Sequence, residues 1–113
     1  MSTDYVLLVI GKTKEAELPK PQNLKEQAAL ELARITHHED RTVLDAVVEG
    51  NTLLGAALAY VARTFAEDTL IVVVPDYESR PWAYLVDGEG NLVPTTPGFQ
   101  DPKGRFFPWP AEL

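Results

Sequence analysis

The 113-residue sequence contains no cysteine, which excludes disulfide bonds, cysteine-ligated zinc sites and thiol nucleophiles. It also has no excess of positive charge, because ten Lys and Arg residues stand against 17 Asp and Glu residues and give a net charge of −7. Nucleic acids and anionic membranes are bound through clustered Lys and Arg side chains. We therefore expect no direct binding to nucleic acid or to a membrane surface.

Long apolar segments are absent as well, since no run approaches the roughly 20 residues that span a bilayer. The sequence begins with polar residues rather than with the basic segment of a signal peptide. We therefore expect a soluble, cytoplasmic protein. An apolar content of 45% and a charged content of 24% are typical of a folded protein, and the length fits a single domain.

Four short apolar runs predict β-strands. They are residues 5–10, 69–74, 82–86 and 91–93. The first two are apolar at nearly every position, which indicates burial on both faces of a sheet. The last two flank the Gly-rich turn 87–90 and therefore predict a β-hairpin.

The sequence also predicts a helix over residues 23–36. Asn23 and Glu26 have the spacing of a capping box. An apolar stripe recurs at helical intervals and consists of Leu24, Ala28, Leu32 and Ile35. Residues 42–49 are ambiguous, because their valines favour a strand while Gly50 is a typical helix end. We favour a helix there. A strand would instead make the first part of the chain a parallel βαβαβ arrangement.

Residues 52–67 predict the most apolar helix of the chain. Large apolar residues form one stripe along it, and a second stripe of small residues allows another backbone to approach closely. The small stripe includes Gly55, Ala59 and Ala62. Because this helix is apolar on most of its circumference, its second face is covered either by the rest of the domain or by another subunit. The second alternative makes these three residues candidate partner contacts.

Residues 94–113 differ in composition from the rest of the chain, with five of its nine prolines and four of its aromatic residues. Proline at this density excludes a helix or a central strand, whereas aromatic side chains gain free energy by burial. We therefore predict an extended segment that packs on its own domain or on a partner. Its candidate anchors for a partner are Phe99, Phe106, Phe107 and Trp109.

The best candidate ligand site is the polar loop 76–80, which follows a predicted buried strand at the kind of position where α/β sheets bind ligands. No motif connects this loop to a particular reaction. Its candidate acid, base and anion-binding residues are Asp76, Tyr77, Glu78 and Arg80.

Other resemblances to functional motifs fail on spacing. Gly11-Lys12-Thr13 follows a predicted strand, but a phosphate-binding loop requires glycine where Val6 stands. Residues 37–40 hold two His and two acids without the spacing of a helical metal site, and we place them at the C-terminal end of the first helix. We therefore predict no catalytic residue, no metal site and no cofactor.

Together these elements predict a small α+β fold, in which a mixed sheet of about four strands carries two to three helices and an extended Pro- and aromatic-rich tail. The alternative is a three-layer βαβαβ fold. Residues 1–93 are the predicted domain, and residues 94–113 are the predicted C-terminal segment, packed on that domain or on a partner.

The predicted function is that of a non-enzymatic, self-associating protein-binding module that acts as an adaptor, an inhibitor or a small regulatory subunit. Three observations support it: the absence of a complete catalytic motif, a helix with two apolar faces and an aromatic tail. One alternative is a small-ligand-binding protein or enzyme that uses the loop 76–80 near Tyr5 and Trp82. Another is a structural subunit of a larger assembly.

Overall fold

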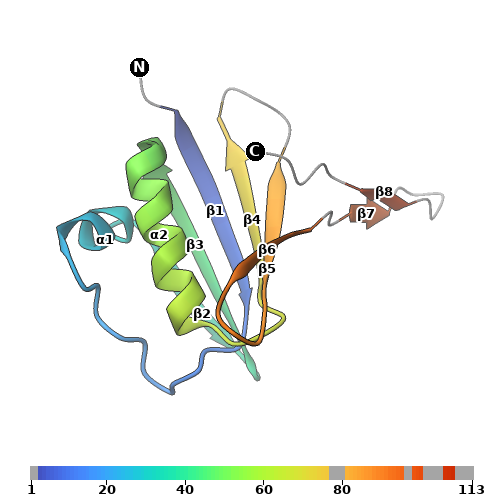
Figure 1. Cartoon of the computed structure of the whole chain (residues 1–113), viewed down its shortest axis with the longest axis horizontal. Helices are drawn as coiled ribbons and strands as arrows, with labels where there is room; N and C mark the ends of the chain where they lie inside the picture. Colours follow the sequence, from blue (N-terminus) through green and yellow to red (C-terminus); the bar gives the residue numbers. More distant parts are fainter. Residues whose placement is uncertain (1–2, 77–80, 96–97, 101–105, 109–113) are drawn as a thin grey trace.

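The computed structural model describes residues 3–76, 81–95, 98–100 and 106–108, the last two ranges by their backbone alone. Most of this chain forms one antiparallel sheet of six strands in the order β2-β3-β1-β4-β5-β6 (Figure 1). The strands are β1 (Asp4–Gly11), β2 (Arg34–His38), β3 (Arg41–Glu49), β4 (Leu70–Pro75), β5 (Trp82–Val86) and β6 (Leu92–Thr95).

Two helices, α1 (Leu24–Ala29) and α2 (Gly50–Thr64), lie on the same side of the sheet (Figure 1). Helix α2 connects β3 to β4, which run parallel to each other because β1 lies between them and is antiparallel to both. These elements therefore form a split βαβ unit. Two further short strands, β7 (Gly98–Gln100) and β8 (Phe106–Pro108), pair only with each other within the described residues.

The hydrophobic core lies between α2 and the face of the sheet that α2 covers. Leu7 of β1, Leu44 of β3 and Ile71 of β4 are fully buried on that face. Val61 and Phe65, at the end of α2, are fully buried against them. Burial of side chains of this size contributes roughly 1.5–3 kcal/mol each, so this face is the main source of folding free energy.

The predicted fold class is wrong in the type and size of the sheet. The sheet is antiparallel throughout and has six strands rather than about four, and the parallel βαβαβ alternative is wrong for the same reason. The main cause is the segment 42–49, which was expected to be helical and forms most of β3. Its residues alternate between buried and less buried positions, and this period of two is that of a strand with one covered face.

The first predicted helix is also too long. Helix α1 ends at Ala29, and the chain then forms β2, which pairs with β3 as a hairpin. Leu24 and Leu32 belong to the predicted apolar stripe, yet their exposed fractions are 81% and 68%. A longer helix would gain little from burying that stripe, so pairing with β3 prevails. Residues 37–40 consequently lie at the turn of a hairpin and not at a helix end.

Several predicted segments are confirmed individually. The four expected strands correspond to β1, β4, β5 and β6, and the helix expected at 52–67 corresponds to α2, each within three residues at its ends. The Asn23 side chain accepts a hydrogen bond from the backbone N–H of Glu26 at 2.9 Å, which confirms one half of the predicted capping box. The Glu26 side chain accepts from the backbone N–H of Gln22 at 3.0 Å, where the capping box expects that of Asn23.

Candidate binding surface

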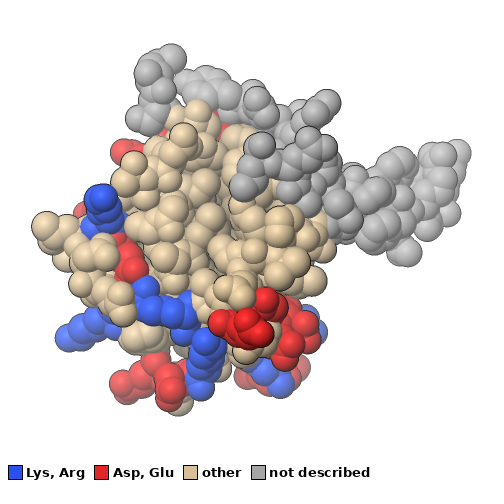
Figure 2. All heavy atoms as spheres, in the orientation of Figure 1, with Lys and Arg blue, Asp and Glu red and all other residues tan. Residues whose placement is uncertain are grey.

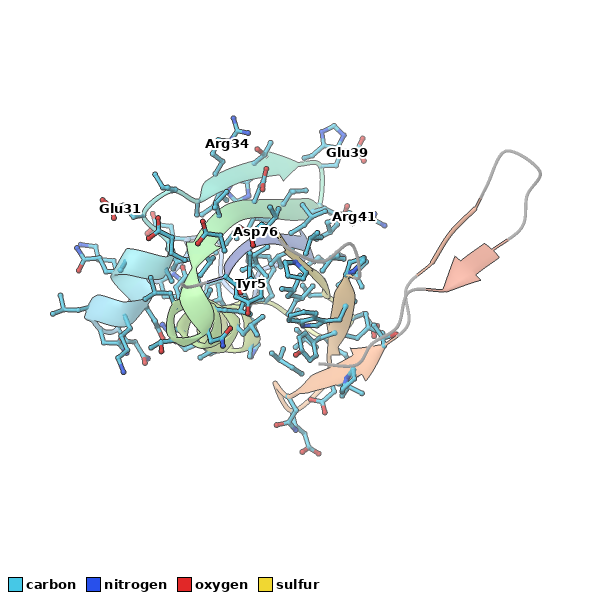
Figure 3. All side chains as sticks on the ribbon, turned by 90° about the horizontal axis from the view of Figure 1, so that it is seen from above. Tyr5, Glu31, Arg34, Glu39, Arg41 and Asp76 are labelled. Carbon is cyan, nitrogen blue, oxygen red and sulfur yellow. The ribbon has the colours of Figure 1, made fainter. Side chains whose placement is uncertain are left out.

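The two faces of the sheet differ in what covers them. Successive residues of a strand point to opposite faces, and directly paired residues of neighbouring strands share a face. Tyr5 and Leu7 of β1 are buried on the helix side, whereas Val6 and Leu8 lie on the opposite side, which we call the outer face. Figure 3 shows Tyr5 on the helix side and Arg34 directed away from the helices. Neither helix covers the outer face.

One end of the outer face carries three carboxylates on neighbouring strands, which we call the acidic row. Asp4 of β1 is paired with Glu49 of β3. Asp76 follows β4, and its backbone N–H donates to the carbonyl oxygen of Asp4 at 3.0 Å. The acidic row therefore crosses three strands as Glu49, Asp4 and Asp76.

The other end of the outer face carries a histidine, an arginine and a lysine, which we call the basic row, and acidic side chains including Asp40 and Asp68 lie near it. His38 of β2 is paired with Arg41 of β3. Lys12 follows the last paired residue of β1 and falls opposite Arg41 when the register is continued. Lys12 Nζ also lies 3.5 Å from Asp40 Oδ2, and both of these side chains are largely exposed. Such an exposed pair is weak and leaves the lysine available to other anions.

An apolar band separates the two rows. Val6 of β1 is paired with Val47 of β3, and their exposed fractions are 42% and 48%. Ile10 and Val43 are paired on the other side of the band, and Leu8 lies between the two pairs. Contiguous exposed apolar residues rimmed by charge are typical of protein-binding surfaces.

The middle of the band contains one ion pair. Asp45 of β3 is paired with Leu8 of β1 on one side and with Arg34 of β2 on the other. Arg34 Nη2 lies 3.9 Å from Asp45 Oδ2, and neither side chain is buried. Because solvent screens such a pair, it contributes at most about 1 kcal/mol to folding.

The residues predicted for a small-ligand site are only partly described. Asp76 is exposed at the end of β4 and belongs to the acidic row. Tyr77, Glu78 and Arg80 lie outside the described residues.

Tyr5 and Trp82, expected near that loop, are in contact with each other. Their ring centres are 5.9 Å apart with the planes at 70°, an edge-to-face arrangement. The Tyr5 hydroxyl donates to Oδ1 of Asn51 at the start of α2. Tyr84 lies two residues after Trp82 on β5, and burial raises the pKa of its hydroxyl. Because Tyr5 is itself buried, this aromatic pair closes one end of the core.

The predicted partner contacts on α2 lie on its side facing away from the sheet. Gly55 and Ala59 are exposed, and Ala62 is partly exposed. A Cβ added to Gly55 would meet no atom within 4 Å. The surface over the upper part of α2 consists of uncharged atoms (Figure 2). Packing against the described residues therefore does not require glycine at position 55.

Three of the four predicted aromatic anchors belong to the ribbon of β7 and β8. Phe99 is paired with Phe107, and Phe106 is paired with Gln100. The structure describes their backbone only. Trp109 lies outside the described residues.

A buried ion pair, which the sequence analysis missed, connects the two helices. Arg63 Nη1 donates to Glu26 Oε2 at 2.6 Å, and Arg63 Nη2 donates to the other carboxylate oxygen. Hydrogen bonding to Arg63 lowers the pKa of Glu26 despite the opposing effect of burial, and the carboxylate raises the pKa of Arg63. Tyr60, whose pKa is raised by burial, donates to the carbonyl of Pro19 at 2.6 Å. Because these groups satisfy one another, we interpret the cluster as structural.

A hollow of about 640 Å³ lies at the basic-row end of the sheet, where charged side chains gather at the lower end of Figure 2. It is lined by side chains of both signs, including Lys12, Arg41, Glu67 and Asp68. A lining of mixed charge favours neither an anionic nor a cationic ligand. We therefore assign no ligand to this hollow.

The sequence of β3 contains a signal for the outer face. Within residues 41–49 the charged residues Arg41, Asp45 and Glu49 all fall on one parity, and Leu44 and Val48 fall on the other. A strand with one buried face produces this alternation. The acidic row was not detectable in this way, since its members are distant in sequence and meet through the strand order.

The described residues contain no group of three His, Cys, Asp or Glu side chains placed to hold a metal ion. In the same part of the chain, no helix has both the length and the apolar character needed to cross a membrane. Comparison of the chain with protein-family models, with curated proteins and with solved structures found no match.

Proposed function

We propose that this chain is a non-enzymatic protein-binding module of the cytoplasm that self-associates and acts as an adaptor, an inhibitor or a small regulatory subunit. Its binding surface is the outer face of the sheet. The observation that carries the proposal is the apolar band, in which Val6 and Val47 keep 42% and 48% of their surface exposed in the centre of a six-stranded sheet.

The position of the band supports this proposal. Valine side chains on the middle strands of a sheet are normally covered by a second layer, because leaving them in water forfeits roughly 25 cal/mol for each Å² of apolar surface. Here the helices supply that layer on one face only. A protein partner supplies it on the other.

The test replaces both exposed valines by threonine, Val6→Thr and Val47→Thr. Threonine keeps the branched shape and the strand preference of valine but adds a hydroxyl that opposes burial. We expect the double variant to stay folded and to lose both self-association in sedimentation velocity and capture of stoichiometric partners from cell extract. The matched control is Leu24→Gln, which changes an 81% exposed leucine on α1 and leaves binding unchanged. Binding by the double variant at the wild-type level would contradict the proposal.

The aromatic tail is a second proposed binding segment of the same module. Trp109→Ala in the full-length chain tests it, because removal of a tryptophan anchor typically costs more than 1 kcal/mol of binding free energy. We expect weaker partner capture, measured by the same sedimentation and extract experiments. Unchanged capture would remove the tail from the binding surface and leave the outer face.

A further inference from the structure

The outer face has a symmetric order along its two central strands. On both strands the order is charged, apolar, central residue, apolar, and charged with the opposite sign. The outer residues of β3 are Arg41, Val43, Asp45, Val47 and Glu49, and those of β1 are Lys12, Ile10, Leu8, Val6 and Asp4. Leu8 and Asp45 are directly paired and stand at the middle of the two series.

From this order we infer that the partner of the outer face is a second copy of this chain, docked face to face about a two-fold axis that crosses the strands at Leu8 and Asp45. This inference rests on the proposed function and adds the identity and orientation of the partner. A two-fold axis brings the same patch of both copies together, so the patch must complement itself. The outer face meets that condition.

The charges determine the orientation. With the axis across the strands, the acidic row of each copy faces the basic row of the other. Glu49 then lies against Arg41 of the second copy, and Asp4 lies against Lys12 of the second copy. An axis along the strands would instead place the acidic rows against each other, and juxtaposed like charges oppose association.

The apolar residues fit the same arrangement. Val6 falls against Ile10 of the second copy, Val47 falls against Val43, and Leu8 meets its own equivalent on the axis. Asp45 and the Arg34 paired with it also meet their own equivalents on the axis. Each Asp45 keeps its own Arg34 at 3.9 Å, so every charge at the centre has a partner of opposite sign within its own chain. The band is covered without an unpaired charge at its centre.

The shape of the sheet limits the contact to this region. Twisted sheets that pack face to face keep their strands within about 30° of each other, which brings the middle strands closest together. Leu8 and Asp45 lie on β1 and β3, the third and second strands of the six-stranded order. On the next strand, β4, Val72 is paired with Leu8 and is only 7% exposed, so the open part of the outer face lies on β3 and β1. These two strands carry Glu49 and Asp4 of the acidic row and Arg41 of the basic row, and Lys12 directly follows β1.

Charge reversal across the predicted contact tests the inference. In Glu49→Lys, two symmetric contacts become repulsive, and the same holds for Arg41→Glu. Exposed ion pairs are worth 0.2–1 kcal/mol each, so we expect each variant to weaken the dimer by about tenfold at low salt. In an equimolar mixture of the two variants, both contacts of the mixed dimer are complementary. We expect the mixture, and the double variant Arg41→Glu with Glu49→Lys, to return to wild-type association.

The net charge of the chain separates this inference from general repulsion. Glu49→Lys raises the net charge from −7 towards zero, so general repulsion predicts tighter association of this variant, whereas row pairing predicts weaker association. Glu31→Lys and Lys25→Glu, on exposed positions of the helix side, are the matched controls for charge alone. Sedimentation velocity from low micromolar to submillimolar concentration gives the affinities, and urea denaturation verifies that each variant is folded.

Weakening by both single reversals, with recovery in the mixture, establishes the two-fold contact. Unchanged or tighter association of Glu49→Lys overturns it, as does a wild-type chain that stays monomeric throughout the concentration range. In the monomeric case, loss of partner capture by the double threonine variant still upholds the proposed function. Normal capture by that variant rejects the function itself.

Discussion

The helix face and the outer face of the sheet are built from the same strands and largely from the same residue types, yet they behave differently. On β3, Val48 is buried and its neighbour Val47 has 48% of its surface exposed. On β1, Leu7 is fully buried and Val6 is 42% exposed. Residue type therefore does not decide which valine stabilises the monomer. The presence of α2 over one face decides it.

The comparison also separates folding from binding. Apolar side chains on the helix face contribute their burial free energy when the chain folds, whereas the exposed valines of the outer face, Val6 and Val47, gain it only when another surface covers them. The charged residues also differ between the two sides of the sheet. The helix side contains the buried Glu26–Arg63 ion pair, whereas the charged rows at the ends of the outer face are exposed. Substitutions on the two faces should accordingly affect different measurements.

The largest effect is expected from neighbouring leucines of β1 that lie on opposite faces. Leu7→Ala removes a fully buried side chain and should lower the free energy of unfolding by about 3 kcal/mol, because the cavity cannot refill. Leu8→Ala, on the partly covered outer face, should cost about 1 kcal/mol in the monomer. Urea denaturation at low protein concentration measures both.

The two leucine substitutions should have the reverse order of effect on self-association. Leu8 lies on the proposed axis, so Leu8→Ala should weaken self-association more than Leu7→Ala does once both are compared in their folded state by sedimentation velocity. Equal loss of folding stability in the two variants would show that the outer face at Leu8 is covered within the monomer. That result would contradict the proposed difference between the two faces.

A second contrast compares the buried and the exposed ion pair. Arg63→Met leaves the Glu26 carboxylate without its partner inside the protein, and we expect a loss of about 2 kcal/mol at pH 7 after allowance for the partial exposure of Arg63. Arg34→Met removes the exposed partner of Asp45 and should cost less than about 0.5 kcal/mol.

The buried pair also predicts a pH dependence. Arg63 holds the pKa of Glu26 below the ordinary value of 4.5, and a lowered carboxyl pKa stabilises the folded state above the unfolded pKa. That contribution is lost as the pH falls through the lower, folded value. Urea denaturation at pH 7 and at pH 3 should therefore show a large difference between wild type and Arg63→Met at pH 7 and a smaller one at pH 3. A difference independent of pH would contradict the ionic assignment.

Much of the fold was predictable from local patterns, and the errors have identifiable physical causes. The continuous apolar runs of β1 and β4 and the small and large stripes of α2 were recognised because each signal lies within one element. For the segment 42–49, Gly50 favours a helix end, whereas the alternation of Thr42 to Glu49 is that of a strand, and the strand is correct. Gly50 adopts a φ of 82° and leads directly from strand to helix, so it marks a junction and not a helix end.

The candidate surface was less predictable than the fold. Its rows depend on which strands are neighbours, and Asp4, Glu49 and Asp76 are widely separated in sequence. No local pattern places β1 between β3 and β4. The predicted contacts Gly55, Ala59 and Ala62 rest on a helix pattern alone, and such a pattern identifies an uncharged surface but not what it binds.

A smaller effect is expected at Gly11, on the helix face. A Cβ added there would lie 2.1 Å from Oγ1 of the buried Thr69, and Thr69 has no space in which to move because it is fully buried. Gly11→Ala should therefore destabilise the fold by about 1.5 kcal/mol through overpacking, measured by urea denaturation. An unchanged free energy of unfolding would mean that the helix face is less tightly packed at Gly11 than at the centre of the sheet.

A small effect of the opposite sign is expected at Gly55. Its added Cβ would enter open space on α2, and alanine is favoured over glycine inside a helix, so Gly55→Ala should stabilise the fold by about 0.7 kcal/mol. Sedimentation velocity of the same variant decides between the outer face of the sheet and the small stripe of α2 as the site of self-association. If the small stripe of α2 is the site of close backbone approach, the extra methyl group will weaken self-association. If the outer face of the sheet is the contact, association will stay at the wild-type level while stability rises, and this is the result that we expect.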